Sequence, residues 1–350
     1  MEILLYTIVF LLLLVVSNVT NRFLPQLPLP LVQIVLGISL GFILPQEKFH
    51  LDTELFLALV IGPLLFREAE ESNVTSILKH WRIVLYLIFP VIFISTVGLG
   101  YLAHLLWGAL PLAACVAVGA ALGPTDLVAF ASLSERFSFP KRVENILKGE
   151  GLLNDASGLV AFRVALLAWT TGSFSLGKAS ISLVLSIIGG FAIGMLSAGL
   201  NRWLHKLLMS AQVSDIASEL LLELSLPLVT FFLAEEIHVS GIIAVVVAGI
   251  FKASRFKRIT LLEAQVDSVT ETIWNTVNFM LNGSVFIILG MELEMISEPI
   301  LKSPIYDNLL LLVSIVLLTF LLFALRFIML FTFYFIRIRR LHKNVGNYLK

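Results

Sequence analysis

The sequence has little charge and a single cysteine. Charged residues make up 14% of the 350 residues, whereas soluble domains carry about 25%, so an ordinary soluble domain is excluded. Hydrophobic residues make up 58%, and the mean hydropathy is +0.97. The one cysteine, Cys115, excludes a disulfide framework within the chain, and its apolar surroundings predict a small buried side chain. We therefore expect a polytopic membrane protein.

Other missing features narrow the function further. The sequence contains no GxxxxGK[ST] loop and no long polar insertion that could hold a nucleotide-binding domain, so we expect neither ATP nor any other cofactor. The net charge is zero and the basic residues alternate along the chain, so we expect no nucleic-acid partner. Glu2 stands where a signal peptide carries lysine or arginine, so the first apolar run should remain as a transmembrane helix.

The hydrophobic runs predict an all-α protein in one transmembrane domain over 1–350, with about eleven spans. Some runs are shorter than the about 20 residues of a perpendicular span, so we expect tilting or burial within a helix bundle. The approximate ranges are 3–17, 30–44, 53–66, 82–107, 110–132, 145–170, 179–201, 214–234, 239–252, 271–291 and 307–336.

Lysine and arginine predict the orientation of these spans. With the N-terminus outside, the cytoplasmic loops contain 19 of the 24 basic residues, and the outer loops contain Lys48, Lys178 and Lys302. Arg163 and Arg326 fall within spans. This asymmetry follows the positive-inside rule, and it predicts a multi-pass protein of the cell (plasma) membrane, surrounded by the lipid bilayer. Glu292 and Glu294 would then lie in an acidic outer loop.

Two pairs of spans resemble each other. The segment LVQIVLGI (31–38) resembles IAVVVAGI (243–250), and LALVIGPLLF (57–66) resembles VFIILGMELE (285–294). Because even-numbered spans match odd-numbered spans, the two copies would have opposite orientations in the membrane. Inverted repeats of this kind are typical of secondary transporters.

The repeat predicts how the chain is organised. A first inverted repeat would occupy about 1–170, a linker helix about 179–201, and a second repeat about 214–350. The partners of the fifth and sixth spans would begin near the end of the sequence. We therefore expect an incomplete second repeat that lacks two helices, either because the chain is truncated or because the protein departs from this architecture.

The fifth span contains a helix-breaking sequence beside a carboxylate. In VGAALGPTDLVAF, Gly123 and Pro124 directly precede Thr125 and Asp126. Proline removes a backbone donor and glycine weakens the helix, so we expect the helix to unwind and to present carbonyls and helix ends to a bound ion. An ordinary proline kink, with Asp126 capping the next half-helix, agrees with the same residues.

The sixth span opens with EGLLNDASG (150–158). Gly151, Asp155 and Gly158 share one stripe of a helix, and Glu150 and Asn154 share the neighbouring stripe. The two glycines let another helix approach and leave the carboxylate accessible. An aspartate at bilayer depth costs about 2.5 to 3.5 kcal/mol on insertion scales, so we expect Asp155 to bind an ion and carry a proton.

These motifs together resemble the monovalent cation/proton antiporters. TD in one span, SFPKR in the following loop and EGLLND in the next span are similar to the electroneutral, NhaP-like sodium/proton exchanger branch, which has Asn-Asp rather than Asp-Asp. GPLLF and LRFIMLF extend the resemblance along the chain. It implies an inverted-repeat fold with an unwound helix and commonly thirteen spans, a homodimer, and a transporter rather than an enzyme.

The resemblance implies roles for individual residues. Asp155 corresponds to the essential carboxylate, which would bind Na⁺. Asn154 corresponds to the residue that replaces a second acid in electrogenic relatives, and Thr125 and Asp126 correspond to the unwound helix.

The remaining correspondences include two departures from the family pattern. Glu150 corresponds to a glutamate that pairs with an arginine, here Arg326, and such a pair avoids an isolated buried charge. Leu127 and Gly151 stand where the family usually has proline and often serine, which affects the expected choice between Na⁺ and K⁺. Glu68, after GPLLF, is a candidate for the cytoplasmic cation path.

The same residues predict a mechanism. Burial favours a protonated carboxyl group and a bound cation favours the charged form, so Asp155 would hold one or the other. Alternating access would then exchange one Na⁺, Li⁺ or K⁺ for one proton without net charge movement, because Asn154 is neutral. Such exchange would serve pH homeostasis and sodium tolerance. A cation channel or a non-transporting pH or ion sensor could use the same site, and an intramembrane aspartyl protease would need two carboxylates that share a proton.

Overall fold

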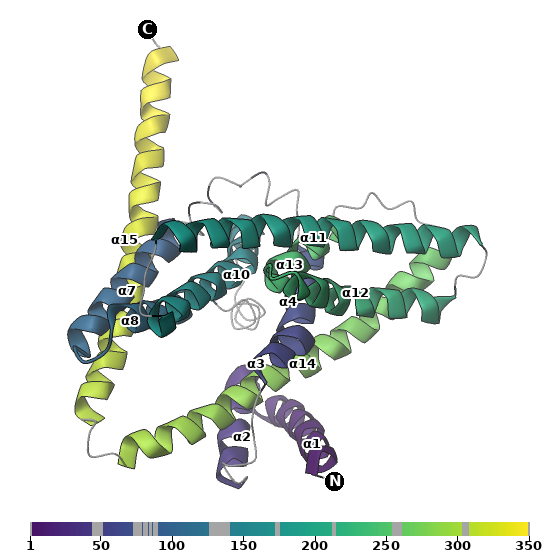
Figure 1. Ribbon diagram of the computed structural model, residues 1–350, viewed down its shortest axis with the longest axis horizontal. Coiled ribbons are helices and arrows are strands. Elements are labelled where there is room, and N and C mark those ends of the chain that lie inside the picture. The colour runs from purple at the N-terminus through teal and green to yellow at the C-terminus, as the bar shows by residue number, and fades with distance from the viewer. Residues whose placement is uncertain are drawn as a thin grey trace. The chain divides into compact units, whose positions relative to one another are not determined.

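The computed structural model describes residues 2–43, 52–72, 79, 83, 86, 90–125, 141–171, 176–211, 215–253, 261–302 and 308–348. Helices account for most of this part of the chain, which contains no strand, and the all-α fold class is confirmed. The helices in Figure 1 are α1 (Glu2–Phe23), α2 (Leu29–Ile43), α3 (Thr53–Phe56), η2 (Leu57–Ile61), α4 (Gly62–Glu71), α7 (Ile92–Leu106), α8 (Leu112–Leu122), α10 (Lys141–Thr171), α11 (Leu176–Ser210), α12 (Ile216–Glu236), α13 (Gly241–Ala253), α14 (Leu261–Lys302) and α15 (Asn308–Tyr348).

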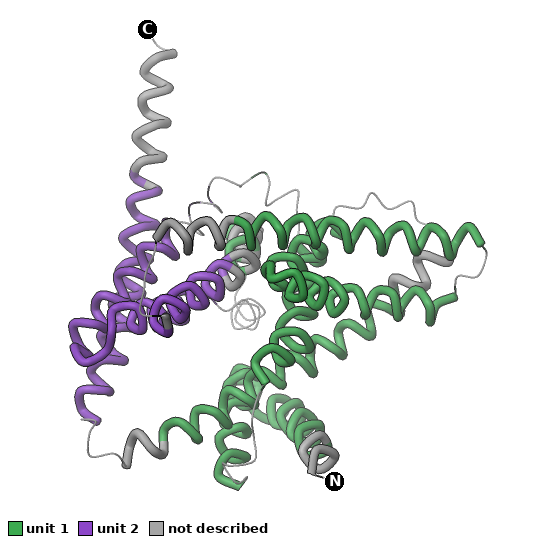
Figure 2. Tube along the Cα trace, viewed as in Figure 1, with its two compact units in different colours: residues 1–79, 126–152, 180–303 green, residues 80–125, 153–179, 304–350 purple. Residues whose placement is uncertain are grey.

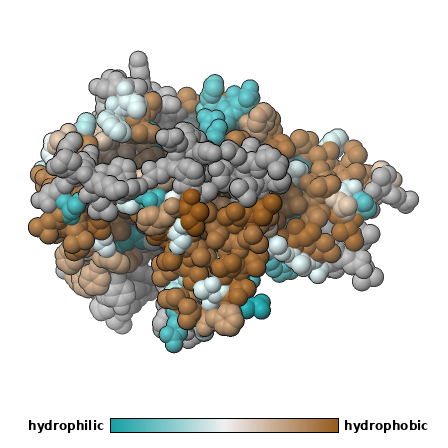
Figure 3. All heavy atoms as spheres, turned by 90° about the horizontal axis from the view of Figure 1, so that it is seen from below, coloured by the Kyte–Doolittle hydropathy of each residue, from teal (hydrophilic) through white to brown (hydrophobic). Residues whose placement is uncertain are grey.

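The lengths and compositions of the helices agree with a multi-pass membrane protein. Within the described residues, four segments are long and apolar enough to cross a membrane: Leu185–Ser210, Ile216–Glu236, Ser268–Ser297 and Asn308–Phe333. Shorter apolar helices of 10–17 residues accompany them. Hydrophobic side chains cover much of the face shown in Figure 3, as expected where lipid replaces water. The count of about eleven spans stays a prediction.

Packing divides the chain into two compact units (Figure 2). Unit 1 comprises residues 1–79, 126–152 and 180–303, and unit 2 comprises residues 80–125, 153–179 and 304–350. Helix α10 contributes its first part to unit 1 and the rest to unit 2. Each unit draws on both predicted repeats, so this division does not test the repeat boundaries.

Glycines set the helix contacts of unit 1. Helix α2 packs closely against α14, and α4 packs against α13. A Cβ atom at Gly37 would lie 2.1 Å from the carbonyl oxygen of Ile287, and one at Gly290 would lie 2.2 Å from a carbonyl oxygen of α2. A Cβ atom at Gly249 would lie 2.5 Å from the carbonyl oxygen of Phe66. Backbones can approach this closely only where the side chain is absent.

The GPLLF motif changes the helical winding of the third predicted span. Between α3 and α4 the chain forms one π-helical segment, η2, in which the Gly62 N–H bonds to the Leu57 carbonyl five residues earlier. Pro63 has no N–H to donate to the carbonyl of Leu59, so the ordinary four-residue pattern cannot continue here. The helix nevertheless runs on to Glu71, beyond the predicted end of the span at residue 66.

Unit 2 is built around the contact between α7 and α8, with α15 packed against α7. The two helices meet at Gly100 and Gly119, where a Cβ atom at Gly119 would lie 2.2 Å from the carbonyl oxygen of Thr96. Cys115 is fully buried, so the predicted small buried side chain is confirmed. The core of this unit contains Leu99, Ala103, Cys115 and Leu318.

The predicted acidic outer loop at Glu292 and Glu294 is wrong. Both residues lie within α14, which continues unbroken through them. Glu294 is only 4% exposed, and its Oε2 lies 3.0 Å from the position that a Cβ atom would take at Gly41 of α2. The missing side chain at Gly41 provides the room for the buried carboxyl group of Glu294. Contrary to the prediction from the sequence, the two glutamates therefore do not mark the end of the helix.

Candidate functional site

The candidate site forms where α8 ends. The helix stops at Leu122, and residues 123–125 are not helical. Pro124 lacks a backbone N–H, and the last carbonyls of any α-helix have no intrahelical partner. Helix α8 therefore ends at the predicted breaking sequence. Asp126 and Leu127 lie outside the described residues, so a helix that resumes after the break stays a prediction.

Arg326 satisfies one of the carbonyls at this helix end. Its Nη2 atom on α15 donates to the carbonyl oxygen of Gly123. A guanidinium group is favourable here, because the C-terminus of a helix carries a partial negative charge. The structure thus brings together two predicted site residues that are 203 positions apart in the sequence.

Helix α10 packs directly against the break. A Cβ atom at Gly158 would lie 2.2 Å from Cγ of Pro124, so glycine at this position lets the proline ring approach the helix. One turn earlier along α10, the Asn154 amide Nδ2 donates to Thr125 Oγ1 over 3.0 Å. Asn154 and Thr125, predicted as site residues from two different spans, are therefore in direct contact.

Two acidic residues of α10, Glu150 and Asp155, lie close to Asn154 along the helix. Glu150 and Asn154 are one turn apart on α10, as predicted, and are 4% and 0% exposed. Gly151 is also buried. The backbone of Asp155 belongs to α10, and its side chain lies outside the described residues. The predicted ion pair between Glu150 and Arg326 stays a prediction.

Sequence reasoning missed a residue of α7 at this site. Thr96 is 5% exposed, and its Oγ1 lies 3.5 Å from the position that a Cβ atom would take at Gly123. The only available signal was the polar pair Ser95 and Thr96 within an otherwise apolar run. That pair is too common in membrane helices to single out a site.

A charged network in unit 1 was also not predicted. The Lys252 Nζ atom contacts Glu70 over 2.9 Å and also binds Glu223, which joins α13 to α4 and α12. Arg67 binds Glu70 over 2.9 Å and Glu71 over 2.7 Å on its own helix. Because each charge has an opposite partner, this network is suited to holding helices together.

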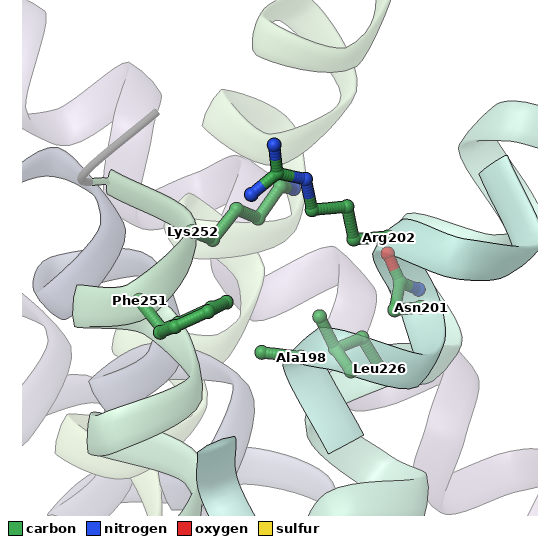
Figure 4. Close-up of a pocket in the computed structure, with 6 residues that line it drawn as sticks. All are labelled: Ala198, Asn201, Arg202, Leu226, Phe251 and Lys252. Atoms are coloured by element: carbon green, nitrogen blue, oxygen red, sulfur yellow. The ribbon is translucent and has the colours of Figure 1, made fainter. Parts of the chain in front are cut away.

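Two further features of unit 1 bear on the predicted cation path. Glu68 lies on α4 and is partly buried, and its role in the path stays a prediction. Figure 4 shows a small pocket between α11, α12 and α13. Its two charged lining residues, Arg202 and Lys252, are both basic, and no acidic side chain of the described residues lines it. The pocket is lined by Ala198, Asn201, Arg202, Leu226, Phe251 and Lys252.

Comparison with known proteins decides the family. A family model described as "Sodium/hydrogen exchanger, transmembrane" matches residues 8–345. The chain belongs to the sodium/hydrogen exchanger family. The predicted resemblance to monovalent cation/proton antiporters is thereby confirmed at the level of the family.

Curated relatives and solved structures agree with this membership. The exchanger-family chain is 38% identical over 334 residues to the "Sodium, potassium, lithium and rubidium/H(+) antiporter" of Bacillus subtilis, covering 95% of the chain and 50% of that protein. It is 34% identical over 314 residues to the "Uncharacterized Na(+)/H(+) exchanger YjcE" of Escherichia coli, covering 88% and 56%. The chain thus spans about half the length of the curated relatives it matches.

The fold is that of a solved antiporter. The sodium proton antiporter MjNhaP1 from Methanocaldococcus jannaschii superimposes with a TM-score of 0.64, covering 83% of this chain and 71% of that chain at 18% sequence identity. At this identity the comparison establishes the fold alone. The expected antiporter fold is confirmed.

Proposed function

We propose that this protein is a secondary active transporter that exchanges a monovalent cation for a proton at Asp155. The contact between Asn154 and Thr125 carries the proposal, because it brings the Asn-Asp pair of α10 against the broken end of α8. A helix end leaves several carbonyl oxygens without an intrahelical partner. Arg326 binds that of Gly123, and further oxygen atoms at the break are candidates to bind a cation. The name of the Bacillus subtilis relative includes sodium, potassium, lithium and rubidium, so Na⁺, Li⁺ and K⁺ are the first candidates.

The proposed exchange follows from competition for one group. Asp155 holds either the cation or the proton, Asp126 lies beside the same break in the sequence, and Arg326 and Glu150 form a structural ion pair near the site. With Asn154 neutral, one cation is exchanged for one proton and no net charge moves. Alternating access then exposes the loaded site to each side of the membrane in turn.

The domain organisation belongs to the same proposal. The second predicted span (α2) packs against the tenth (α14), and the third (α4) packs against the ninth (α13). This cross-pairing is what a two-fold axis between two inverted repeats would produce. Gly37 and Gly249 occupy the same position in the first pair of matching segments. Gly37 contacts the Ile287 carbonyl and Gly249 contacts the Phe66 carbonyl, so Phe66 and Ile287 are equivalent too. We therefore align GPLLF, which ends at Phe66, with GSVFI, which begins at Gly283 and ends at Ile287. This shifts the sequence alignment by about two helical turns.

Localisation and assembly are part of the proposal as well. The excess of basic residues in alternate loops supports a plasma-membrane protein with its N-terminus outside. The resemblance to the antiporters supports a homodimer. Roles in pH homeostasis and sodium tolerance would follow from the exchange itself.

Exchange in proteoliposomes tests the proposal. Protein expressed from its complete gene is reconstituted with an outwardly directed proton gradient, and the gradient is followed while Na⁺, Li⁺, K⁺ or Rb⁺ is added. We expect cation addition to collapse the gradient and Asp155→Asn to prevent the collapse. Asp215→Asn makes the same substitution at an exposed helix cap, and in this variant cation addition should still collapse the gradient.

Three results would contradict the proposal. Exchange by the Asp155→Asn variant equal to the unsubstituted protein would remove Asp155 from the site. Cation currents that need no proton gradient would show a channel. Failure of every cation to collapse the gradient in the unsubstituted protein would favour a non-transporting sensor.

A further inference from the structure

Thr96 on α7 has a buried hydroxyl group with no hydrogen-bond partner among the described residues. Its own helix offers one, because a helical serine or threonine hydroxyl readily bonds to the carbonyl four residues earlier. Other helical side chains of this chain make that bond: Ser39, Thr272, Thr276, Ser284, Ser314, Thr319 and Thr332. The buried hydroxyls of Ser95, Thr230 and Thr270 also have no partner among the described residues, so what sets Thr96 apart is its position.

The Thr96 hydroxyl lies at the broken end of α8. Its Oγ1 is 3.5 Å from the Cβ position of Gly123, the first residue beyond the helix. The Thr96 carbonyl meanwhile packs against Gly119 of α8, so the backbone of α7 is held against that helix. Since Gly123 has no side chain, no side-chain atom of Gly123 lies between the Thr96 hydroxyl and the break. Thr125 and Asn154 contact each other at the same break.

We propose that Thr96 Oγ1 is a ligand of the transported cation. An alkali cation loses water when it enters a protein site, and protein oxygen atoms replace that water. Hydroxyl oxygens have two acceptor lone pairs, and a buried hydroxyl that makes no hydrogen bond is unfavourable until a ligand satisfies it. This inference rests on the proposed function, and it adds to the site a residue from a helix that no motif of the sequence marks.

The neighbouring Ser95 provides a matched control. It lies on the same helix, is 1% exposed, and its hydroxyl has no partner among the described residues either. However, the atoms of α7 nearest to the Cβ positions of Gly119 and Gly123 belong to Thr96 and Gly100, and none belongs to Ser95. Removal of the Ser95 hydroxyl therefore reports the general effect of a lost buried hydroxyl in α7.

The experiment compares Thr96→Val, Thr96→Ser and Ser95→Ala in the protein expressed from its complete gene. Valine keeps the branched shape without the hydroxyl, and serine keeps the hydroxyl without the methyl group. Two quantities are measured: the cation concentration that gives half-maximal exchange in proteoliposomes, and the NaCl or LiCl concentration that gives half-maximal thermal stabilisation in detergent. Choline chloride corrects the second measurement for ionic strength.

We expect Thr96→Val to raise both concentrations about three- to tenfold, the effect of losing one oxygen ligand of hydrogen-bond strength. The maximal exchange rate should change less than these concentrations. Thr96→Ser and Ser95→Ala should stay within about twofold of the unsubstituted protein on both measures. If Thr96→Val does not fold, Thr96→Ala replaces it, since alanine also removes the hydroxyl and cannot overpack.

The remaining outcomes separate this inference from the proposed function. Unchanged half-maximal concentrations in the hydroxyl-free variants overturn the role of Thr96, as does an equal loss in Thr96→Ser, which would show a packing role for the methyl group. If the unsubstituted protein is stabilised by cations but exchanges none, the proposed function fails and the stabilisation measurement alone decides Thr96. If it shows neither stabilisation nor exchange, both are overturned.

Discussion

The contact between Gly158 and Pro124 allows a quantitative test of how the site is held together. In Gly158→Ala, the new Cβ atom would lie 2.2 Å from Cγ and 3.1 Å from Cδ of Pro124, whereas carbon atoms pack at about 3.5 to 4.0 Å. The proline ring cannot turn aside as a flexible side chain would. Helix α10 and the break must therefore separate by about 1 Å or more to restore ordinary packing.

The expected cost follows from two opposing effects. Overpacking of this kind costs about 1 to 3 kcal/mol, whereas replacing a glycine inside a helix by alanine gains about 0.5 to 1 kcal/mol. Gly199→Ala on α11 isolates the second effect, because no atom lies within 4 Å of its Cβ position. The difference in unfolding free energy between the two alanine variants should therefore be about 1 to 3 kcal/mol, with Gly158→Ala the less stable.

The assay is thermal unfolding of the purified protein in detergent, together with exchange in proteoliposomes. Gly199→Ala should unfold at or slightly above the temperature of the unsubstituted protein and exchange normally. Gly158→Ala should unfold at a lower temperature and need more cation for half-maximal exchange, because separating α10 from the break lengthens the bond between Asn154 and Thr125. Equal unfolding temperatures for the two variants would refute the close contact.

Two further substitutions test unit 1. Lys252→Met should lower the free energy of unfolding by about 3 kcal/mol, because it removes the cation that binds Glu223, whereas Glu70 keeps Arg67. Adding Glu223→Gln should restore most of that loss, and no loss in thermal unfolding would show that the network is not stabilising. Asp215 caps the N-terminus of α12, and its hydrogen bonds from Ser218 hold the pKa of its carboxyl group below the usual value. The contribution of Asp215 to stability should therefore be complete above about pH 4 and be lost as the pH falls through the lowered pKa. In urea unfolding, Asp215→Ala should be less stable than the unsubstituted protein at pH 7, and the two proteins should be equally stable in strong acid. A constant difference between the two proteins over this pH range would contradict the cap.

Much of the site could be predicted from the sequence because its chemistry depends on local pattern. Gly123 and Pro124 predict a break in the fifth span, since the missing proline N–H and the flexible glycine act within the segment itself. The outcome still depends on context, because the Gly62-Pro63 pair changes the winding of its helix without ending it. Helical periodicity likewise placed Glu150 and Asn154 one turn apart on α10. The same local reasoning failed at Glu294, where the room for a buried carboxyl group comes from Gly41 of another helix.

The sequence by itself determined the helical fold class, the position of the helix-breaking pair Gly123 and Pro124, and the stripe of α10 that carries Glu150 and Asn154. Only the tertiary structure decided which groups meet at that end: the Arg326 guanidinium on the Gly123 carbonyl, the Asn154 amide on the Thr125 hydroxyl, and Thr96 facing the break. The physical reason is range. Hydrogen bonds within a helix connect residues four positions apart, so the sequence pattern reveals them, whereas contacts between helices depend on how whole surfaces pack.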